Sequence, residues 1–381
     1  MAANLNPPWY KRRPYIHFDL PLGPQNAASY VGDPDGVSHH PFYPLLSYEI
    51  LTPHIKKTPG AAQPFERTHK ARLISYPSHK DGYIFSYYKS KLEAIYEDWV
   101  KAKGLAEAVT AFRSTGENNV TLAKKAFDFI KSNPGCLVVV TDVENFFNTI
   151  NHEELKRIWA RFLGVARLPD DHFAVYKAIT RYSVVQRHKV YNLFGIPLSS
   201  RLDQVDDPKR LCTPKEFREK VILRGLVECN PGLIKGIGIP QGSSLSPLLS
   251  NMYMADLDLA LNSWMASVGG GYWRYCDDIL IVVPSGQLRL PILRRLDEEL
   301  KRLRLKRSKP KTQRIRSNQL ATHKQLQYLG LIFNGSKILI RSSSIHRYHR
   351  KLGKAIQAAE YRRKKETNVS GQWSPLRQQA L

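Results

Sequence analysis

Residues 271–283 read Gly-Tyr-Trp-Arg-Tyr-Cys-Asp-Asp-Ile-Leu-Ile-Val-Val. The adjacent carboxylates Asp277 and Asp278 separate two runs of aromatic and β-branched residues, which is the composition of β-strands. The pattern predicts a β-hairpin over 272–283 with the acids at its tip. Burying two neighbouring carboxylates is costly unless a cation compensates, so a bound divalent metal explains the pair. An ordinary turn explains it equally well, because Asp is common at hairpin tips.

A third acid, Asp142, follows another predicted strand. Residues 136–141 read Cys-Leu-Val-Val-Val-Thr, an unbroken run typical of a strand buried on both faces. If this strand lies beside the hairpin, Asp142 comes next to Asp277 and three carboxylates face one point. Like charges this close need a counter-charge, which two Mg²⁺ ions bound through carboxylates and substrate phosphates supply. This is the arrangement of two-metal phosphoryl transfer, in which one ion activates a 3′-hydroxyl and the other stabilises the leaving pyrophosphate.

The 381-residue chain is strongly basic, with 58 Lys and Arg against 33 Asp and Glu and a formal net charge of +25. This excess favours a polyanionic partner, with nucleic acid the commonest and an anionic membrane surface the rival. No apolar run approaches the ~20 residues that span a bilayer, and the N-terminus lacks the order of a signal peptide. Four cysteines without Cys-x-x-Cys spacing argue against a zinc site and a disulfide scaffold. We therefore expect a cytoplasmic protein with no membrane partner.

The positive charge is concentrated in particular segments. Residues 294–316 contain eleven Lys or Arg and three acids, and residues 341–365 contain nine and one. Both segments predict a salt-sensitive surface that grips a duplex. Residues 9–15 read Trp-Tyr-Lys-Arg-Arg-Pro-Tyr and interleave cations with rings. This motif fits a surface that follows a nucleic-acid strand, and it fits an irregular extension packed on the core equally well.

Hydrophobic periodicity predicts most of the remaining elements. We expect helices at residues 88–103, 119–132, 152–162, 248–264 and 288–305, and a Gly/Ser/Pro loop at 236–247. Two further β-hairpins are expected, one at 72–86 with a polar tip and one at 327–340 with Asn334-Gly335 as its turn. Residues 1–70 show little periodicity, and residues 164–232 are not placed by any pattern.

Five short motifs resemble those of reverse transcriptases, in the order in which that family has them. They are Val-Thr-Asp142-Val-Glu-Asn-Phe-Phe147 (motif A), residues 238–247 (motif B), Tyr275-Cys-Asp-Asp278 (motif C), Lys309-Pro-Lys-Thr312 (motif D) and residues 329–333 (primer grip). Within the family the chain most resembles bacterial members: group II intron and retron enzymes, and especially the abortive-infection and defence-associated lineages. Residues 112–119 and 88–97 are similar to segments of those bacterial enzymes.

The resemblance covers about residues 70–340 and implies an α+β fold: a right-hand polymerase with fingers, a ferredoxin-like palm (antiparallel sheet plus helices) and a short basic helical thumb. The implied domains are an N-terminal extension (1–70), fingers (71–135), palm (136–340, with an inserted segment 164–232 that is part of fingers and palm) and thumb (341–381). No segment resembles RNase H, integrase or HNH domains. Since the chain stops soon after the primer grip, we expect either a short thumb or a longer native tail beyond residue 381.

The resemblance also implies residue roles. Asp142 and Asp277 are expected to be the principal metal ligands together with Val143, while Asp278 ligates metal, orients the hairpin or contacts the primer end. Phe147 matches the steric gate, whose ring excludes a ribose hydroxyl and so favours dNTPs; the alternative is an ordinary core phenylalanine.

Further residues are expected around the substrate. Gln241 and Gly242 would line the nucleotide and template side, since glycine permits close backbone approach. Lys311 is a candidate to protonate or neutralise the leaving pyrophosphate, or else it binds a nucleic-acid backbone. Candidates for triphosphate contacts from the fingers, each equally explained as a solvated surface charge, are Arg72, Lys80 and Arg113.

The implied function is a Mg²⁺-dependent RNA-directed DNA polymerase of bacterial antiviral defence. Its expected partners are dNTPs, a DNA product and an RNA template supplied by an associated noncoding RNA. Two alternatives stay open. One is untemplated or protein-primed DNA synthesis of the abortive-infection type, and the other is a catalytically idle, maturase-like RNA-binding protein. The sequence leaves the primer, the defence trigger and the oligomeric state unassigned.

Overall fold

The computed structural model describes residues 6–57, 65–114, 116–202, 210–287, 291–320 and 325–370. The elements, in chain order, are α1 (Pro24–Val31), α2 (Pro34–Ser38), β1 (Leu45–Lys57), β2 (Phe65–Tyr76), α3 (His79–Ala102), α4 (Asn119–Ser132), β3 (Leu137–Asp142), α5 (Phe146–Thr149), α6 (His152–Phe162), α7 (Asp170–Thr180), β4 (Ser183–Gln186), α8 (Arg187–Leu193), α9 (Pro214–Glu216), η2 (Phe217–Ile222), β5 (Val227–Cys229), α10 (Ser246–Tyr253), α11 (Ala255–Ser267), β6 (Gly271–Tyr275), β7 (Asp278–Val283), η3 (Ser285–Gln287), α12 (Ile292–Arg302), η4 (Lys309–Lys311), β8 (Gln313–Arg316), η5 (Ser317–Gln319), β9 (Leu326–Tyr328), β10 (Leu331–Phe333), β11 (Ile338–Ile340) and α13 (Ser342–Ser370).

The central sheet has the strand order β6-β7-β3-β8 and is antiparallel throughout. The two apolar runs predicted as strands pair along their length, so that Val138 lies opposite Val282 and Asp142 lies opposite Asp278. Every residue of β3 is buried, as its unbroken β-branched run requires. The pairing brings the end of β3 and the start of β7 to one edge of the sheet, where the three predicted acids lie.

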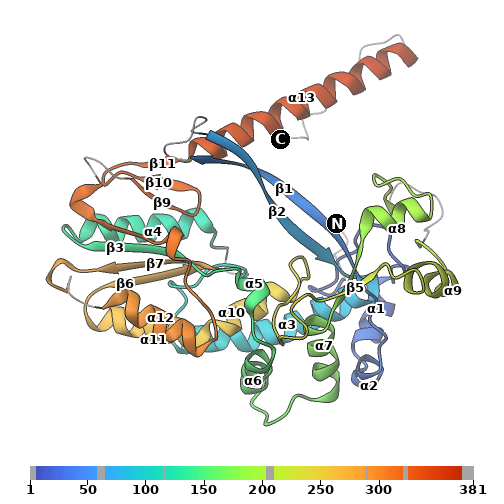
Figure 1. The fold of residues 1–381 in the computed structure, drawn as a ribbon, viewed down its shortest axis with the longest axis horizontal. Coiled ribbons are helices and arrows are strands. Elements are labelled where there is room, and N and C mark those ends of the chain that lie inside the picture. Colours follow the sequence, from blue (N-terminus) through green and yellow to red (C-terminus); the bar gives the residue numbers. More distant parts are fainter. Residues whose placement is uncertain are drawn as a thin grey trace.

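Both faces of this sheet are covered (Figure 1). Val138 and Leu280 face α4 and the small sheet β9–β11, where the rings of Phe127 and Phe333 stack at 4.9 Å. The alternate residues Val139 and Ile281 face a larger core built on α3, α10, α11 and α12. Each fully buried aliphatic side chain contributes ~1.5–3 kcal/mol to folding. The acidic edge is therefore carried by a rigid, doubly packed frame.

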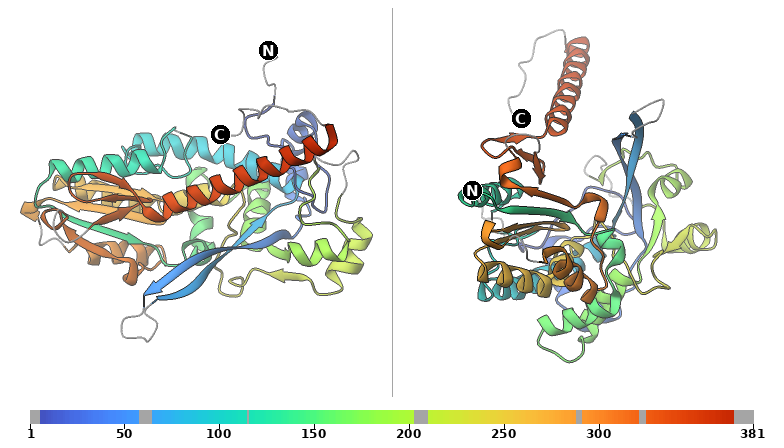
Figure 2. Two further views of the ribbon diagram at one scale, coloured as in Figure 1. Left: turned by 90° about the horizontal axis from the view of Figure 1, so that it is seen from above. Right: turned by 60° about the vertical axis from the view of Figure 1, so that its left-hand side comes forward.

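A second sheet, β2-β1-β4-β5, carries a long hairpin. β1 and β2 pair from Leu46↔Tyr76 to Lys57↔Phe65, whereas only residues 45–47 also pair with β4. The outer part of the hairpin is thus a two-stranded ribbon that stands away from the body (Figures 1 and 2). Residues 1–70, in which the sequence shows little periodicity, contain α1, α2 and β1, and the predicted boundary at 70/71 falls inside β2.

The segment 164–232, which no pattern placed, contributes α7, α8 and the strands β4 and β5. β4 runs parallel to β1, and β5 pairs with β4 to complete the second sheet. A strand from residues 45–57 and strands from residues 183–229 therefore share one sheet. The stretch 203–209 in this segment lies outside the described residues.

Several predicted elements have the expected bounds: α4 and α6 coincide with the prediction, and the hairpin β6–β7 holds the two acids at its tip. The hairpin predicted at 72–86 is wrong, since β2 ends at Tyr76 and α3 begins at His79. Ser78 accepts a hydrogen bond from the Asp81 N–H as N-cap, and Asp19 accepts from the N–H groups of His79 and Lys80 (both 2.8 Å). The polar residues taken for a hairpin tip are a capped helix N-terminus.

Two other predicted elements are divided. The helix expected at 248–264 is two helices, α10 and α11, which meet at Met254. The strand expected at 327–333 bends at Leu329 and Gly330, whose φ angles are +50° and +85°, so β9 and β10 form a hairpin of their own. The turn predicted at Asn334-Gly335 is confirmed: Asn334 Oδ1 accepts from the N–H groups of Ser336 and Lys337 between β10 and β11.

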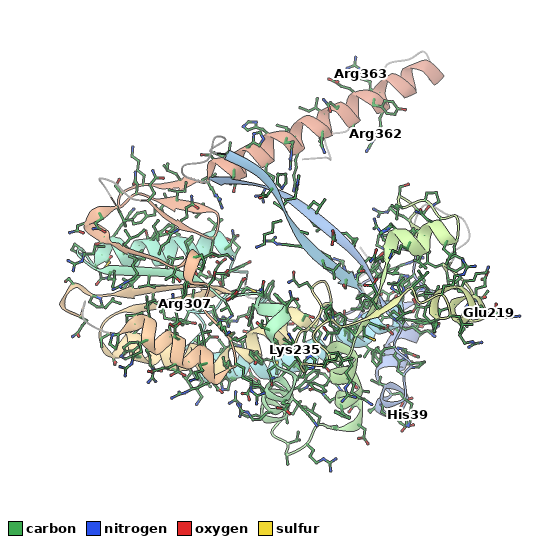
Figure 3. All side chains as sticks on the ribbon, viewed as in Figure 1. His39, Glu219, Lys235, Arg307, Arg362 and Arg363 are labelled. Carbon is green, nitrogen blue, oxygen red and sulfur yellow. The ribbon has the colours of Figure 1, made fainter. Side chains whose placement is uncertain are left out.

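The last helix, α13, leaves the body after β11 (Figures 1 and 2). Figure 3 shows Arg362 and Arg363 on the part of α13 that lies farthest from the sheets. The side chains of α13 described up to residue 363 are mostly exposed. Within the described residues, no helix combines the length and the apolar character needed to cross a membrane.

Candidate active site

The acidic edge of the central sheet brings two carboxylates into contact. Asp142 ends β3 and is 6% exposed, and the Val143 N–H donates to the Asp277 carbonyl (3.2 Å). The Asp142 carboxylate lies within hydrogen-bonding reach of the Asp277 carboxylate. Burial and then the neighbouring Asp142 raise the pKa of Asp277 to about 6, and burial followed by the charges of Asp277 and Asp142 raises the pKa of Asp278 to about 7. Protein groups alone thus leave the negative charge of this edge undercompensated.

Lys311 is the cation that the chain itself brings to this edge. Hydrogen bonds to β3 hold η4 on both sides. Before η4, the Ser308 N–H donates to the Asp142 carbonyl (2.7 Å), and after it the hydroxyls of Thr312 and Thr141 are hydrogen-bonded (2.8 Å). Lys311 Nζ is hydrogen-bonded to Asp142 Oδ2 while the Lys311 side chain stays 56% exposed. An ammonium group therefore lies where a cation is favoured, on a side chain free to move aside.

The donor set fits a hard cation. Asp142, Asp277 and the backbone carbonyl of Val143 offer oxygen only, which suits Mg²⁺ and not softer metals. The described residues contain no group of three or more His, Cys, Asp or Glu side chains arranged to hold a metal by themselves. The convergence of three carboxylates on one point is thus not found; Asp142 and Asp277 meet, and Asp278 lies beside them. Mg²⁺ is commonly bound through one or two carboxylates completed by substrate phosphates and water, so the pair still fits.

A cavity of about 410 Å³ opens above the carboxylate pair. Its walls come from β2, the β3–α5 turn, the loop before α10, the hairpin tip and η4. The lining residues are Lys70, Ala71, Arg72, Leu73, Ile74, Asp142, Val143, Asn145, Phe147, Asn148, Gln241, Asp277 and Lys311. The structure therefore gathers seven of the predicted site residues around one space: Arg72, Asp142, Val143, Phe147, Gln241, Asp277 and Lys311.

Phe147 is held in the cavity wall by the short helix α5. Asn145 begins this helix in the left-handed conformation (φ +47°), which turns the chain sharply after β3. The Phe147 carbonyl accepts a hydrogen bond from the Ile239 N–H (2.9 Å), and its ring packs at 5.6 Å from the ring of Phe146. Phe147 is thus both part of the cavity wall and a half-buried residue that packs against the core.

The loop before α10 is joined to β2 at a position that requires glycine. The Ser75 N–H donates to the Gln241 carbonyl (2.7 Å), which places Gln241 in the cavity wall. Gly242 has φ +116°, and a Cβ there would lie 2.5 Å from the Ser75 carbonyl oxygen. Only glycine accommodates both the backbone conformation and this approach.

Two predicted triphosphate contacts are not brought to the cavity. Arg113 is 8% exposed and donates from Nε and Nη2 to the two carboxylate oxygens of Glu97 (both 2.8 Å), so its charge is used inside the fold. Lys80 lies over the ring of Tyr30 (5.2 Å) on the N-terminal segment. Lys70, which the sequence prediction did not include, does line the cavity. It shares the Arg72 face of β2 by strand alternation, a signal hidden because the strand was placed too late in the chain.

A buried network behind the hairpin tip was also absent from the prediction. Arg274 is fully buried and pairs with Asp258 of α11 through two hydrogen bonds of 2.6 Å. Its Nη1 donates to the Cys276 carbonyl (2.8 Å), and Cys276 has φ +58°, a conformation usually taken by glycine in two-residue hairpin turns. Arg274 therefore holds the residue before Asp277 in a strained conformation. An arginine within a predicted strand carries no sequence signal for this role until its partner on α11 is known.

An antiparallel sheet with paired carboxylates at its edge, below a cavity that also carries basic side chains, defines the palm of a nucleic-acid polymerase. Residues 55–333 match the family described as "Reverse transcriptase (RNA-dependent DNA polymerase)". The match covers most of the chain, and the chain belongs to this family. The predicted family and fold class are thereby confirmed, whereas the bacterial defence lineage stays a prediction.

Comparisons with solved structures and with curated proteins give weaker similarity than the family match. Apo telomerase from Candida tropicalis truncated from its C-terminal domain is 13% identical, with a TM-score of 0.47, and the match covers 77% of this chain and 56% of that one. Apo telomerase from the same organism is 12% identical, with a TM-score of 0.44, and the match covers 79% and 50%. The chain thus spans about half the length of these telomerases. Among curated proteins, none matches the sequence significantly.

Proposed function

We propose that the chain is an RNA-directed DNA polymerase that adds dNTPs to a primer end at the cavity above Asp142 and Asp277. The observation that carries this proposal is that Asp142, at the end of β3, and Asp277, at the tip of the β6–β7 hairpin, line one cavity together with Lys70 and Arg72. A cavity lined by both carboxylates and cations suits a substrate that is a metal-bound triphosphate. Family membership supports the same reaction class.

Residues at different places in the cavity would bind the metal and the phosphates. Asp142, Asp277 and the Val143 carbonyl would hold Mg²⁺, which when bound activates the 3′-hydroxyl and stabilises charge on the phosphates. Lys70 and Arg72, on the exposed face of the β1–β2 ribbon, would bind the outer phosphates as paired cations. Lys311 would leave Asp142 and pass to the phosphates as the site fills, since its exposed side chain is attached only through that ion pair.

Phe147 would select the sugar. Its ring lines the cavity next to Asp142 and Val143 and is anchored through its own backbone to Ile239. We expect Phe147→Ala to admit ribonucleotides, because the ring no longer occupies the space beside C2′. The measurement is the ratio of kcat/KM for a dNTP to that for the matching NTP, which should fall by at least about tenfold. Phe146→Leu is the control for packing, and an unchanged ratio in Phe147→Ala would contradict the assignment.

Primer extension tests the central proposal. Purified protein with an RNA template, a DNA primer, dNTPs and Mg²⁺ should make DNA that copies the template, and Asp277→Asn should lose at least ~10³-fold in rate while remaining folded. Glu153→Gln removes an exposed carboxylate outside the cavity and serves as the matched control. DNA synthesis that persists in Asp277→Asn, or none by the wild type on any template, would overturn the proposal.

Product sequencing separates the alternatives. A product whose sequence is complementary to a defined RNA supports templated synthesis, and a product that matches no template supports synthesis of the abortive-infection type. RNA binding that survives loss of Asp142, Asp277 and Asp278, without any DNA synthesis, supports the idle RNA-binding protein.

We further propose an associated noncoding RNA as template and a role in bacterial antiviral defence, on the motif resemblance alone. Sequencing of co-purified RNA and a phage challenge with and without Asp277→Asn test these two points.

A further inference from the structure

A second, smaller cavity lies behind the loop that carries Gln241. Its volume is about 120 Å³, well above the ~15 Å³ that one water requires. It is lined by Lys11, Arg13 and Tyr15 of the N-terminal segment, by the start of α3 including His79 and Ser86, and by Gly242 and Ser244. The basic and aromatic motif at residues 9–15, which the polymerase mechanism leaves without a role, thus forms one wall of a partly open cavity through Lys11, Arg13 and Tyr15.

This wall is built into the fold. The Tyr15 hydroxyl donates to the Pro77 carbonyl (2.9 Å), and the Tyr15 ring stacks on His79 with centroids 5.1 Å apart. The Tyr10 hydroxyl donates to the Leu22 carbonyl (2.8 Å), and the Pro14 carbonyl accepts from the Leu202 N–H (2.7 Å). Lys11 and Arg13 are consequently held at the cavity by a fixed backbone.

Among the described residues, the cavity wall carries cations and no carboxylate, and the neighbouring acid, Asp19, is bound to the backbone N–H groups of His79 and Lys80. Within the described residues, neither Lys11 nor Arg13 forms an ion pair. His79 is 2% exposed, and its ring nitrogens make no hydrogen bond of good geometry among the described atoms, although the Tyr15 backbone lies close to the ring. The hydroxyls of Ser86 and Ser244 are hydrogen-bonded to each other (3.1 Å), which leaves one of their two protons able to donate outward. Two cations, a buried imidazole and one remaining hydroxyl donor suit a group with several oxygens and a negative charge, such as a phosphate.

The position of the cavity indicates which nucleic-acid strand would place a phosphate in it. Gln241 lines the active-site cavity and the next residue, Gly242, lines this one, so the two spaces lie on either side of one loop. A primer ends at the carboxylates, whereas the template continues past the nucleotide being copied. We propose that Lys11, Arg13 and His79 form a binding site for a backbone phosphate of the single-stranded template, within a few nucleotides of the position being copied. This inference rests on the proposed polymerase function and adds a template contact to it.

Binding to templates with single neutral linkages tests the site. The substrate is a primer–template with four unpaired template nucleotides, in which each of their phosphates in turn is replaced by an uncharged methylphosphonate, and dissociation constants are measured without dNTPs. In the wild type, one position or two adjacent ones should weaken binding about tenfold. The variant Lys11→Ala/Arg13→Ala should bind the normal template about tenfold more weakly and be insensitive at those positions. Its log affinity should also fall less steeply with log salt, by about 1 to 2 in slope.

The matched control is Lys101→Ala/Lys103→Ala, which removes the same charge at the other end of α3 and should behave as the wild type. Equal sensitivity of the wild type and of Lys11→Ala/Arg13→Ala at every linkage would overturn the proposal. An equal loss of affinity on a template without unpaired nucleotides would overturn it too, because the charges would then act generally. If Lys11→Ala/Arg13→Ala binds inorganic phosphate or a free dNTP more weakly than the wild type but binds the template normally, the site takes free phosphates, and this result also overturns the proposal. Primer extension by the same variant separates these results from a failure of the polymerase function, since the carboxylates are unchanged.

Discussion

Arg274 illustrates how a single residue outside the cavity supports the hairpin tip that carries Asp277. Its guanidinium joins Asp258 on α11 to the Cys276 carbonyl at the hairpin tip, and Nη1 also donates to Asn251 Oδ1 on α10 (3.2 Å). The Tyr272 hydroxyl donates to the same Asp258 (2.7 Å). The buried Arg274 side chain therefore connects α10 and α11 to the tip of the β6–β7 hairpin. Such a network is stable only when all its members are satisfied.

Replacing Arg274 should be costly for this reason. We expect Arg274→Met to lower the free energy of unfolding by ~3–5 kcal/mol, because Asp258 is left buried without its partner. Urea unfolding measures this cost. In the double variant with Asp258→Leu, the loss should be smaller than the sum of the two single losses.

A surface ion pair between α6 and α11 provides the control. Arg161 and Asp256 are 40% and 45% exposed, so Arg161→Met should cost at most ~1 kcal/mol. If Arg274→Met costs no more than Arg161→Met, the buried network does not stabilise the hairpin.

At the scale of elements, the contact between β2 and the loop before α10 shapes the nucleotide cavity. The strand supplies Lys70 and Arg72, the loop supplies Gln241, and the hydrogen bond from the Ser75 N–H to the Gln241 carbonyl joins them. The approach is close because Gly242 has no side chain: a Cβ at this position would meet the Ser75 carbonyl oxygen. The position of the β1–β2 hairpin over the carboxylates depends on this glycine.

Gly242→Ala should therefore move the hairpin or destabilise the loop. We expect a loss of ~1–3 kcal/mol from the backbone conformation alone, with an added loss of kcat/KM for dNTP as Lys70 and Arg72 shift. Thermal unfolding and single-nucleotide incorporation measure the two effects.

Gly236→Ala is the matched control, since Gly236 also has a positive φ (+63°) but no atom lies within 4 Å of the added Cβ. Its cost should be limited to about 1–2 kcal/mol with kcat/KM unchanged. Equal kcat/KM in the two variants would contradict the role given to the β2 contact.

For the molecule as a whole, charge is separated in space. The carboxylate pair lies at the edge of a doubly packed sheet, while a strongly basic segment lies on α13, which extends from the body with mostly exposed side chains (Figures 1 and 3). Residues 341–365 contain nine Lys or Arg and one acid. A helix that packs so little against the body adds little to folding and much to the electrostatic attraction of a polyanion.

Removing residues 341–381 should thus separate stability from binding. We expect the truncated protein to unfold within ~1 kcal/mol of the full chain, while duplex affinity falls and the slope of log affinity against log salt decreases by about 0.9 for each phosphate that the protein no longer neutralises. Fluorescence anisotropy over a salt series measures the slope. A full-length variant with the cations of residues 347–363 changed to Gln is the control for length, and an unchanged slope in it would contradict the electrostatic role of α13.

The acids could be located from the sequence because their signals are local. A β-branched run that ends at Asp142 and an acid pair between two apolar runs are each readable within a dozen residues, and the motif order joins them. Helix α4, with its cap at Asn118, and the turn at Asn334 are local in the same sense. Strand composition, helix capping and turn chemistry at these places depend on neighbours in the chain, so the fold class and the positions of the carboxylates could be predicted.

The remaining assignments depended on partners distant in the chain. Arg113 and Lys80 resemble substrate contacts in sequence, but Glu97 and Tyr30 engage them inside the fold. Asp19 turns an expected hairpin tip into the start of α3, and Arg274 acquires its role only through Asp258. A charged side chain has the same local signal whether it meets solvent, a substrate or a buried counter-ion. The sequence by itself determined the polymerase fold and its carboxylates, and the tertiary structure decided which cations serve the cavity, because only long-range packing sets the partner of each charge.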